Sequence, residues 1–343
     1  MTRQKRVVSL GEIMLRLKAP GSERLFQSPV LEATFGGAES NVAVSLANYG
    51  LDAAFCTIVP DNPIGAAAIG ELRRFGVDTS LISRAGERLG TYYLEEGANQ
   101  RPSWVIYDRA HSSIASASPD AFDWDAVFAG ADWFHISGIT PGISAAAAAL
   151  SIEAVRQARA HGVTISCDYN FRKNLWSYGT APIPVMRELV SHIQIGIAGR
   201  EDCQSCLGIA PPLGDDDRDP ARYRSVAEQV LRSFPNLEMQ VITLRESRSA
   251  DDNGWAACLF DGEEFRVSRT YEIRDIVDRV GTGDAFSAGL IYGLLTYDDP
   301  QRVLEFAAAA GCLKHSIPGD ANRVSVAEVE ALVSGGGSGR VQR

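Results

Sequence analysis

Short apolar runs alternate with longer amphipathic stretches along most of the chain. The apolar runs predict buried strands over 53–59, 133–137, 163–168, 193–198 and 240–244. Apolar residues at helical spacing predict helices over 39–49, 64–75, 144–160, 184–191, 225–233, 284–295 and 300–315. Strands that are apolar throughout and alternate with helices form parallel sheets covered on both faces. We therefore expect a three-layer α/β/α sandwich whose first strand spans 6–13.

Two stretches, 14–35 and 90–113, interrupt this rhythm with alternating and aromatic residues and no helix between their strands. Tyr92, Trp104 and Tyr107 are typical strand residues. We expect a small antiparallel β-sheet that stands off the main domain as a lid or a dimerisation surface. No linker divides the chain, so we expect one domain over 6–333, followed by a disordered Gly/Ser tail at 334–343.

Composition narrows the classes of partner. The 343 residues are 45% hydrophobic and 22% charged, with a net charge of −10, which suits a soluble globular protein and opposes non-specific nucleic-acid binding. The uncharged run 133–152 includes His135, Pro141 and many alanines, which favours a buried strand, a turn and a helix over a membrane span. The apolar run near the N-terminus is too short for a signal peptide. We expect a cytoplasmic protein with no nucleic-acid or membrane partner.

The strongest chemical signal is Gly281-Thr282-Gly283-Asp284 at the start of an apolar helix. The first backbone N–H groups of a helix are unpaired and its dipole is positive there, so anions bind readily. Glycine lets the chain approach such an anion without a Cβ in the way. A carboxylate beside a phosphate indicates a base that takes the proton of an attacking hydroxyl, and Asp284 is our candidate. The alternative is a helix N-cap after a glycine-rich turn.

Three other nucleotide-binding classes lack their motifs in this chain. There is no GxxxxGK[ST] loop, no protein-kinase catalytic loop, and no early Gly-x-Gly-x-x-Gly. The first two absences argue against P-loop enzymes and protein kinases. The third argues against an NAD-dependent dehydrogenase.

Two glycine motifs together resemble the signatures of the PfkB, or ribokinase-like, carbohydrate kinases. Asp278 with 281–284 resembles the C-terminal signature, and the segment from Gly36 to Ala43 resembles the N-terminal one. The resemblance spans roughly residues 6 to 333 and implies a ribokinase-like fold with a β-lid, ATP with Mg²⁺, and a sugar hydroxyl as acceptor. It implies a catalytic role for Gly281, Thr282, Gly283 and Asp284. It implies nucleotide contacts at Thr243, Arg245, Gly281, Gly283 and Ala308.

Within that family, the segments 135–141, 168–176 and 107–109 resemble 2-keto-3-deoxygluconate kinases. Asn170 and Arg172 follow a predicted strand, so they lie at the sheet edge where such folds bind ligands. Arg172 and Arg109 together would pin a carboxylate with forked hydrogen bonds, unless they form structural ion pairs. The tyrosines of the predicted lid are either substrate contacts or packed aromatics. The resemblance implies sugar-acid contacts at Gly37, Asn41, Tyr92, Tyr107, Arg109, Asn170, Arg172 and Asp320.

The chain departs from the family pattern at two places. Many relatives carry Asn-x-x-Glu after a central strand, where this chain has Gly199 and Asp202, so Asp202 would serve the water shell of the metal ion. Many relatives also carry an aspartate after the first strand, where this chain has Arg16. The charge of Arg16 fits an acidic substrate, or else an ion pair within the lid.

We therefore expect ATP-dependent phosphorylation of a sugar acid, 2-keto-3-deoxygluconate, to its 6-phosphate. One alternative is a kinase for a neutral sugar such as fructose or ribose, which would not need the arginines. Another is a catalytically silent sugar-binding protein, which would lack the base at Asp284. We expect a homo-oligomer, a dimer formed through the lid.

Overall fold

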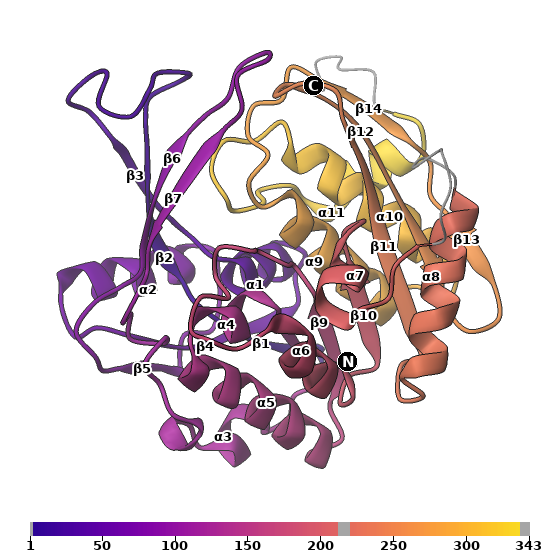
Figure 1. Cartoon of the computed structure of the whole chain (residues 1–343), viewed down its shortest axis with the longest axis horizontal. Helices are drawn as coiled ribbons and strands as arrows, with labels where there is room; N and C mark the ends of the chain where they lie inside the picture. The colour runs from indigo at the N-terminus through magenta and orange to yellow at the C-terminus, as the bar shows by residue number, and fades with distance from the viewer. Residues whose placement is uncertain (1–2, 212–219, 337–343) are drawn as a thin grey trace.

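The computed structural model describes residues 3–211 and 220–336. One large sheet of ten strands runs through the centre (Figure 1). Its order is β13 (Phe265–Val267), β12 (Asp252–Phe260), β11 (Met239–Ser247), β10 (Ile195–Ala198), β9 (Thr164–Asp168), β8 (Trp133–Ser137), β1 (Arg6–Leu10), β4 (Asp52–Val59) and β5 (Ile82–Arg84), with β14 (Tyr271–Arg274) beside β12.

The sheet is parallel from β5 to β11 and antiparallel at the β12 edge. The predicted parallel sheet is thus confirmed for the strands predicted from the sequence, and β12, β13 and β14 add an antiparallel edge that was not predicted. Only four residues, 248–251, separate β11 from β12. Such a short connection permits a hairpin but not the crossover that a parallel pair requires.

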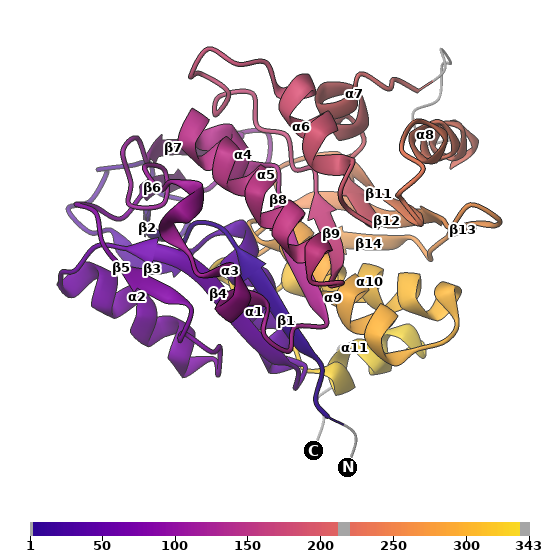
Figure 2. The ribbon, with the colours of Figure 1, turned by 90° about the horizontal axis from the view of Figure 1, so that it is seen from below.

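Helices cover both faces of the sheet, as Figure 2 shows. One layer contains α3 (Trp124–Phe128), α4 (Ile139–Ile143), α5 (Ala145–Ala160), α6 (Pro182–Val190), α7 (Asp202–Leu207) and α8 (Pro220–Ser233), with a 3₁₀ turn at Pro119–Ala121. The other contains α1 (Ala38–Asn48), α2 (Pro63–Arg74), α9 (Thr282–Thr296), α10 (Pro300–Lys314) and α11 (Val326–Val333). Neighbouring residues of β1 serve different layers, since Val8 packs in the first core and Val7 in the second. The predicted α/β/α sandwich is confirmed.

A second, smaller sheet stands apart from the sandwich (Figure 1). Its order is β3 (Glu32–Gly36), β2 (Met14–Lys18), β6 (Thr91–Glu95) and β7 (Trp104–Asp108). The two stretches that interrupt the βα rhythm do form this sheet, as predicted, although its central β2–β6 pair is parallel. The predicted first strand ends at Leu10 rather than at 13, because the chain turns there into β2. At the tip of the small sheet, the Ala250 N–H donates to the Asn99 carbonyl at 2.9 Å, so the tip touches the sandwich.

The uncharged run 133–152 forms β8, α4 and the first turns of α5, as predicted. Among the described residues, no helix is long and apolar enough to cross a membrane. Most of the predicted Gly/Ser tail lies outside the described residues. The fold brings the carboxyl ends of β9, β10 and β11 together with the start of α9, at the edge of the sandwich that faces the small sheet.

Candidate active site

A cavity of about 650 Å³ opens at this edge. It collects nearly every site residue predicted from the sequence, although these come from segments far apart in the chain. They are Gly37, Asn41, Tyr92, Tyr107, Arg109, Asn170, Arg172, Asp202, Thr243, Arg245, Gly281, Thr282, Gly283, Asp284 and Asp320. The small sheet contributes the tyrosines and Arg109, so the cavity lies between it and the sandwich.

The glycine motif forms the N-terminus of α9, and Gly281 is its N-cap. Gly281 has a left-handed φ of 83°, which favours glycine. A Cβ there would lie 2.1 Å from the Asp320 carbonyl oxygen, so no other residue fits without a shift. The Thr282 N–H donates over 3.5 Å to the Arg279 carbonyl, and the next N–H groups have no intrahelical acceptor. This end of α9 can therefore hold an anion with backbone amides, and we call residues 281–283 the anion cradle.

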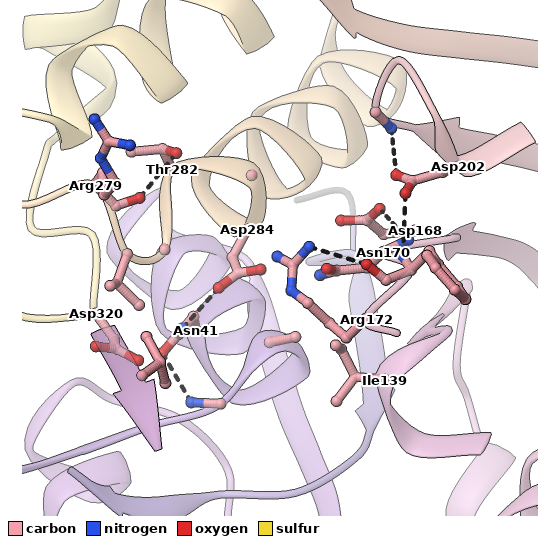
Figure 3. Close-up of a pocket in the computed structure, with 18 of the residues that line it drawn as sticks. Asn41, Ile139, Asp168, Asn170, Arg172, Asp202, Arg279, Thr282, Asp284 and Asp320 are labelled. Carbon is pink, nitrogen blue, oxygen red and sulfur yellow. Dashed lines mark hydrogen bonds between the residues drawn. The ribbon is translucent and has the colours of Figure 1, made fainter. Parts of the chain in front are cut away.

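Asp284 lies directly after the anion cradle, with its carboxylate at the cavity wall (Figure 3). Asn41 Nδ2, from α1, donates to its Oδ2 at 2.7 Å. Burial raises the pKa of Asp284 to about 7, helped by the charges of Asp320 and Glu39, whereas the Asn41 hydrogen bond acts in the opposite direction. A carboxyl group with a pKa near neutrality is suited to general-base catalysis.

The side chain of Arg172 points between Asp284 and Asn170 in Figure 3. Its guanidinium donates to the Phe171 carbonyl at 3.2 Å and forms no ion pair with any described residue. Asn170 sets its direction, because a φ of 35° turns the chain immediately after β9. Burial raises the pKa of Asp168, Asp202 and Asp284, whereas the charge of the guanidinium acts to lower it. No ion pair with a described residue occupies the guanidinium donors, so these donors are available for an anionic ligand.

A second group of arginines lies at the other side of the anion cradle. Arg245 Nη2, at the end of β11, donates to Thr282 Oγ1 at 2.7 Å, and its guanidinium lies over the Trp255 ring. Burial lowers the pKa of Arg245 to about 10, and the charges of Arg279 and Arg172 add to this effect. Within the described chain neither Arg245 nor Arg279 has an ion-pair partner, so this wall carries surplus positive charge next to the cradle.

Two of the predicted anion-binding arginines are already paired. Arg109 Nε donates to Glu12 Oε2 at 2.7 Å, and both side chains are buried. Arg16 pairs with Asp278 and Asp320 and is only 1% exposed. Arg16 therefore forms an ion-pair cluster rather than facing an acidic substrate. Arg109 lines the cavity, but its charge is balanced by Glu12.

The two tyrosines differ in their surroundings. Tyr92 is buried, and its hydroxyl donates to Asp320 Oδ2 at 2.6 Å. Tyr107 is 39% exposed at the cavity wall, with its ring centroid 6.0 Å from that of Tyr92. Both side chains present polar groups from the small sheet to the cavity.

Ala308 does not join this site. It is fully buried in α10, and its carbonyl accepts a hydrogen bond from Trp255 Nε1 at 2.9 Å, whereas Trp255 itself lines the cavity. The expected nucleotide contact at Ala308 therefore needs correction, since the residue is packed behind the cavity wall.

The structure adds residues that sequence reasoning missed. Asp168, Phe171, Arg279 and Trp255 line the cavity. Asp168 had a readable signal, because an acidic residue ends a buried strand there. Burial, followed by the charges of Asp202 and Asp284, raises the pKa of Asp168 well above its ordinary value. Asp202 accepts hydrogen bonds from the Gly199 and Phe171 amides at 2.5 and 3.2 Å, so it fixes the loops on either side.

Several proteins with similar sequences or structures are named as sugar-acid kinases, and others as fructokinase. The chain is 32% identical to the 2-dehydro-3-deoxygalactonokinase of Haloferax volcanii, over 97% of this chain and 98% of that protein. It is 26% identical to the 2-dehydro-3-deoxygluconokinase of Bacillus subtilis, over 91% and 90%. The crystal structure of 2-dehydro-3-deoxygluconokinase from Thermotoga maritima superposes with a TM-score of 0.91 at 47% identity, covering 96% of this chain and 99% of that one.

The family model of the pfkB carbohydrate kinases matches residues 4–325. This range contains the anion cradle, Asp284, the small sheet and every cavity-lining residue named above. The chain belongs to the pfkB family of carbohydrate kinases.

Proposed function

We propose that this protein transfers the γ-phosphoryl group of ATP to the terminal hydroxyl of 2-keto-3-deoxygluconate (2-dehydro-3-deoxygluconate). One observation carries the proposal: an unpaired arginine, Arg172, faces a buried carboxylate, Asp284, that follows an anion-binding helix end. That arrangement suits a substrate with a carboxylate at one end and a reactive hydroxyl at the other. The 47% identity to the Thermotoga maritima enzyme supports the same substrate.

Each wall of the cavity has a part in the proposed reaction. Arg172 forks onto the substrate carboxylate, and the tyrosines and Asn170 orient the sugar acid through their polar groups. Asp284 accepts the proton of the terminal hydroxyl as that oxygen attacks phosphorus. The amides of the anion cradle stabilise the negative charge that develops on the phosphoryl group. Arg245 and Arg279, whose charges are unpaired in the described chain, hold the phosphates of the nucleotide.

The acidic residues of the cavity fit a magnesium ion carried by the nucleotide. Among the described residues, no three side chains gather closely enough to hold a metal ion alone. Mg²⁺ commonly keeps several waters and uses one or two carboxylates together with substrate phosphates. Burial and the neighbouring charges of Asp202 and Asp284 raise the pKa of Asp168, so they disfavour its ionised form. A bound cation would stabilise that ionised form. When bound, the ion would neutralise phosphate charge, and Asp168 and Asp202 would hold its water shell.

A second candidate substrate is 2-keto-3-deoxygalactonate. The Haloferax volcanii relative is named for that sugar acid, at 32% identity. The two acids share the carboxylate and the terminal hydroxyl and differ in the configuration of one carbon. Arg172 and Asp284 would serve both acids equally, so the walls beside the middle of the sugar must decide between them.

The substrate class is tested by steady-state kinetics over a panel of acceptors. We expect kcat/KM for 2-keto-3-deoxygluconate to exceed that for ribose or fructose by at least about 100-fold, because a neutral sugar leaves Arg172 unpaired. The kcat/KM for 2-keto-3-deoxygalactonate should lie between the value for 2-keto-3-deoxygluconate and the values for the neutral sugars. A neutral sugar that is turned over as well as the acid would refute the proposal.

The carboxylate contact is tested by Arg172→Lys, which keeps the charge but loses the fork. We expect kcat/KM for the sugar acid to fall about 10- to 100-fold, since a charge-assisted hydrogen bond contributes about 1.5–3 kcal/mol. The KM for ATP should change little. Arg224→Lys, on the exposed side of α8, serves as the control and should behave as wild type. An Arg172→Lys enzyme that loses thermal stability while keeping its kinetics would show a structural role.

The base is tested by Asp284→Asn and by the pH profile. We expect kcat to fall by about 10²- to 10⁴-fold in the variant. In wild type, kcat/KM should rise with pH around a midpoint near 7, as Asp284 ionises, and level off above it. A wild-type rate that falls with pH across this range would contradict the assignment.

The raised pKa of Asp284 also predicts how protein stability depends on pH. Measuring this dependence checks that Asp284→Asn folds. The folded-state pKa of Asp284 lies above the unfolded value, so the native state is increasingly disfavoured as pH rises from about 4 to about 7. Asn carries no such charge. The Tm advantage of Asp284→Asn over wild type should therefore be larger at pH 8 than at pH 5.

We also propose that two copies associate through the small sheet. Along its edge strand β7, Val105 and Tyr107 line the cavity, whereas the alternating residues Trp104 and Ile106 are 59% and 51% exposed. Exposed large apolar residues on an edge strand are suited to a symmetric contact.

Light scattering after size-exclusion chromatography should show a dimer for wild type and a monomer for Ile106→Lys, because the lysine would place a charge in the contact. Ile64→Lys, at an exposed apolar position on α2, is the matched control and should remain dimeric. A monomeric wild type, or a dimer that survives Ile106→Lys, would refute this contact.

A further inference from the structure

Four charged side chains lie buried beneath the anion cradle. They are Arg16, Asp278, Lys314 and Asp320, with exposed fractions of 1%, 2%, 0% and 4%. They come from four separate segments: β2 of the small sheet, the loop before α9, the last turn of α10, and the loop that follows it. We call them the buried quartet. The proposed reaction gives Arg16, Asp278 and Lys314 no direct part.

Arg16 joins the two carboxylates of the quartet. Its Nη2 donates to Asp278 Oδ2 at 2.6 Å, and its Nη1 donates to Asp320 Oδ1. A planar guanidinium presents two donors in a fixed fork, so it fixes the separation of the groups it bridges. Since both ends of the fork are occupied and the side chain is buried, Arg16 is not free to meet a substrate.

The two carboxylates connect Arg16 to the backbone around the anion cradle. Asp278 Oδ1 accepts from the Val280 N–H at 3.0 Å, one residue before Gly281, and its Oδ2 accepts from the Gly319 N–H at 3.0 Å. The Asp320 carbonyl lies against Gly281, at the place where a Cβ would clash. Hydrogen bonds to Asp278 therefore hold Val280, directly before Gly281, and Gly319, in the loop whose Asp320 carbonyl lies against Gly281.

Lys314 holds the loop that leads to Asp320. Its Nζ donates to the Ile317 carbonyl at 3.1 Å, which ties the end of α10 to the loop leading to Asp320. Burial lowers the pKa of Lys314, and the charges of Asp278 and Asp320 oppose that change. With two cations and two carboxylates, the quartet has no formal net charge, although only Arg16 forms ion pairs with the carboxylates.

Stability alone is a weak reason to bury such a group. Apolar residues of similar volume often stabilise a fold as well as a buried ion pair does. A cluster of charges does, however, fix geometry, and catalysis depends on the position of the cradle amides to within a fraction of an ångström. We propose that Arg16 and Lys314 are positioning residues for phosphoryl transfer, which hold the loop before Gly281 and the loop that lies against it so that the anion cradle faces the phosphate. This inference rests on the proposed kinase function.

The test compares Arg16→Met and Lys314→Met with Arg6→Met. Arg6 forms the same kind of fork, onto Asp52 and Asp78 at 2.9 and 2.7 Å, but at the start of β1 and away from the cavity. All three variants lose a cation that pairs or neutralises charge within the fold, and Tm reports the loss of stability. Only the first two should displace the cradle.

We expect kcat to fall about 100-fold in Arg16→Met and in Lys314→Met, measured well below Tm, because small displacements in an active site have effects of that size. In Lys314→Met, the KM for the sugar acid should change by less than about threefold, since Arg172 and the contacts of Asp320 with Arg16 and Tyr92 are untouched. In both variants the affinity for a non-hydrolysable ATP analogue, measured by calorimetry, should fall about tenfold. Arg6→Met should keep wild-type kcat and nucleotide affinity, whatever its Tm.

Wild-type kcat and nucleotide affinity in either Arg16→Met or Lys314→Met would overturn the inference. If Arg16→Met does not fold, Arg16→Lys retains the charge and loses the fork, and an unchanged kcat in that variant would equally overturn it. If the proposed function is wrong, the wild-type protein will phosphorylate no sugar acid, and this result does not depend on the variants. The nucleotide affinities would still report whether the quartet positions the cradle.

Discussion

The site depends on one electrostatic juxtaposition: the positive end of α9 and the carboxylate of Asp284 occupy the same point of the fold. Backbone amides at residues 281–283 attract an anion, and a carboxylate one residue further on would repel it. Burial resolves the conflict by raising the pKa of Asp284 to about 7, so the group changes charge near neutral pH. In the proposed reaction, Asp284 becomes protonated as the hydroxyl attacks, so a neutral carboxyl group replaces the repelling carboxylate beside the transferred phosphate.

The arginines in and around the cavity fall into two groups, according to whether they form ion pairs. Arg16 and Arg109 meet carboxylates and hold the small sheet against the sandwich. Arg172, Arg245 and Arg279 have no ion-pair partner in the described part of the chain, and all three line the cavity. The cavity also contains carboxylates, but these three arginines give it cationic groups that can hydrogen-bond to an anionic sugar and to a nucleotide.

Features encoded by local sequence could be predicted, and features encoded by distant pairs could not. The start of α9 was readable because glycines, a helical apolar pattern and Asp284 are contiguous. The small sheet was readable because two aromatic, alternating stretches break the βα rhythm. The pairing of Arg16 was not readable, since its partners lie 262 and 304 positions away. Glu12, the partner of Arg109, lies 97 positions away from it.

The same physical reason explains the omissions and errors in detail. The antiparallel edge at β12 depends on a four-residue turn with no glycine, which carries little turn signal. Ala308 occupies a helix whose spacing is clear, but Trp255 from β12 hydrogen-bonds to its carbonyl and lines the cavity, whereas no residue of α10 lines it. Motif resemblance located the site, and only the packing of side chains decided which residues line it.

The most direct test of the account identifies the bond that the enzyme makes. Phosphorus NMR of the purified product, formed from ATP and 2-keto-3-deoxygluconate, reports the protons that neighbour the new phosphoester. Transfer to the terminal hydroxyl predicts a monoester signal split into a triplet by the two protons of the terminal carbon. A doublet, which marks a secondary hydroxyl, or the absence of any sugar phosphoester would contradict the account.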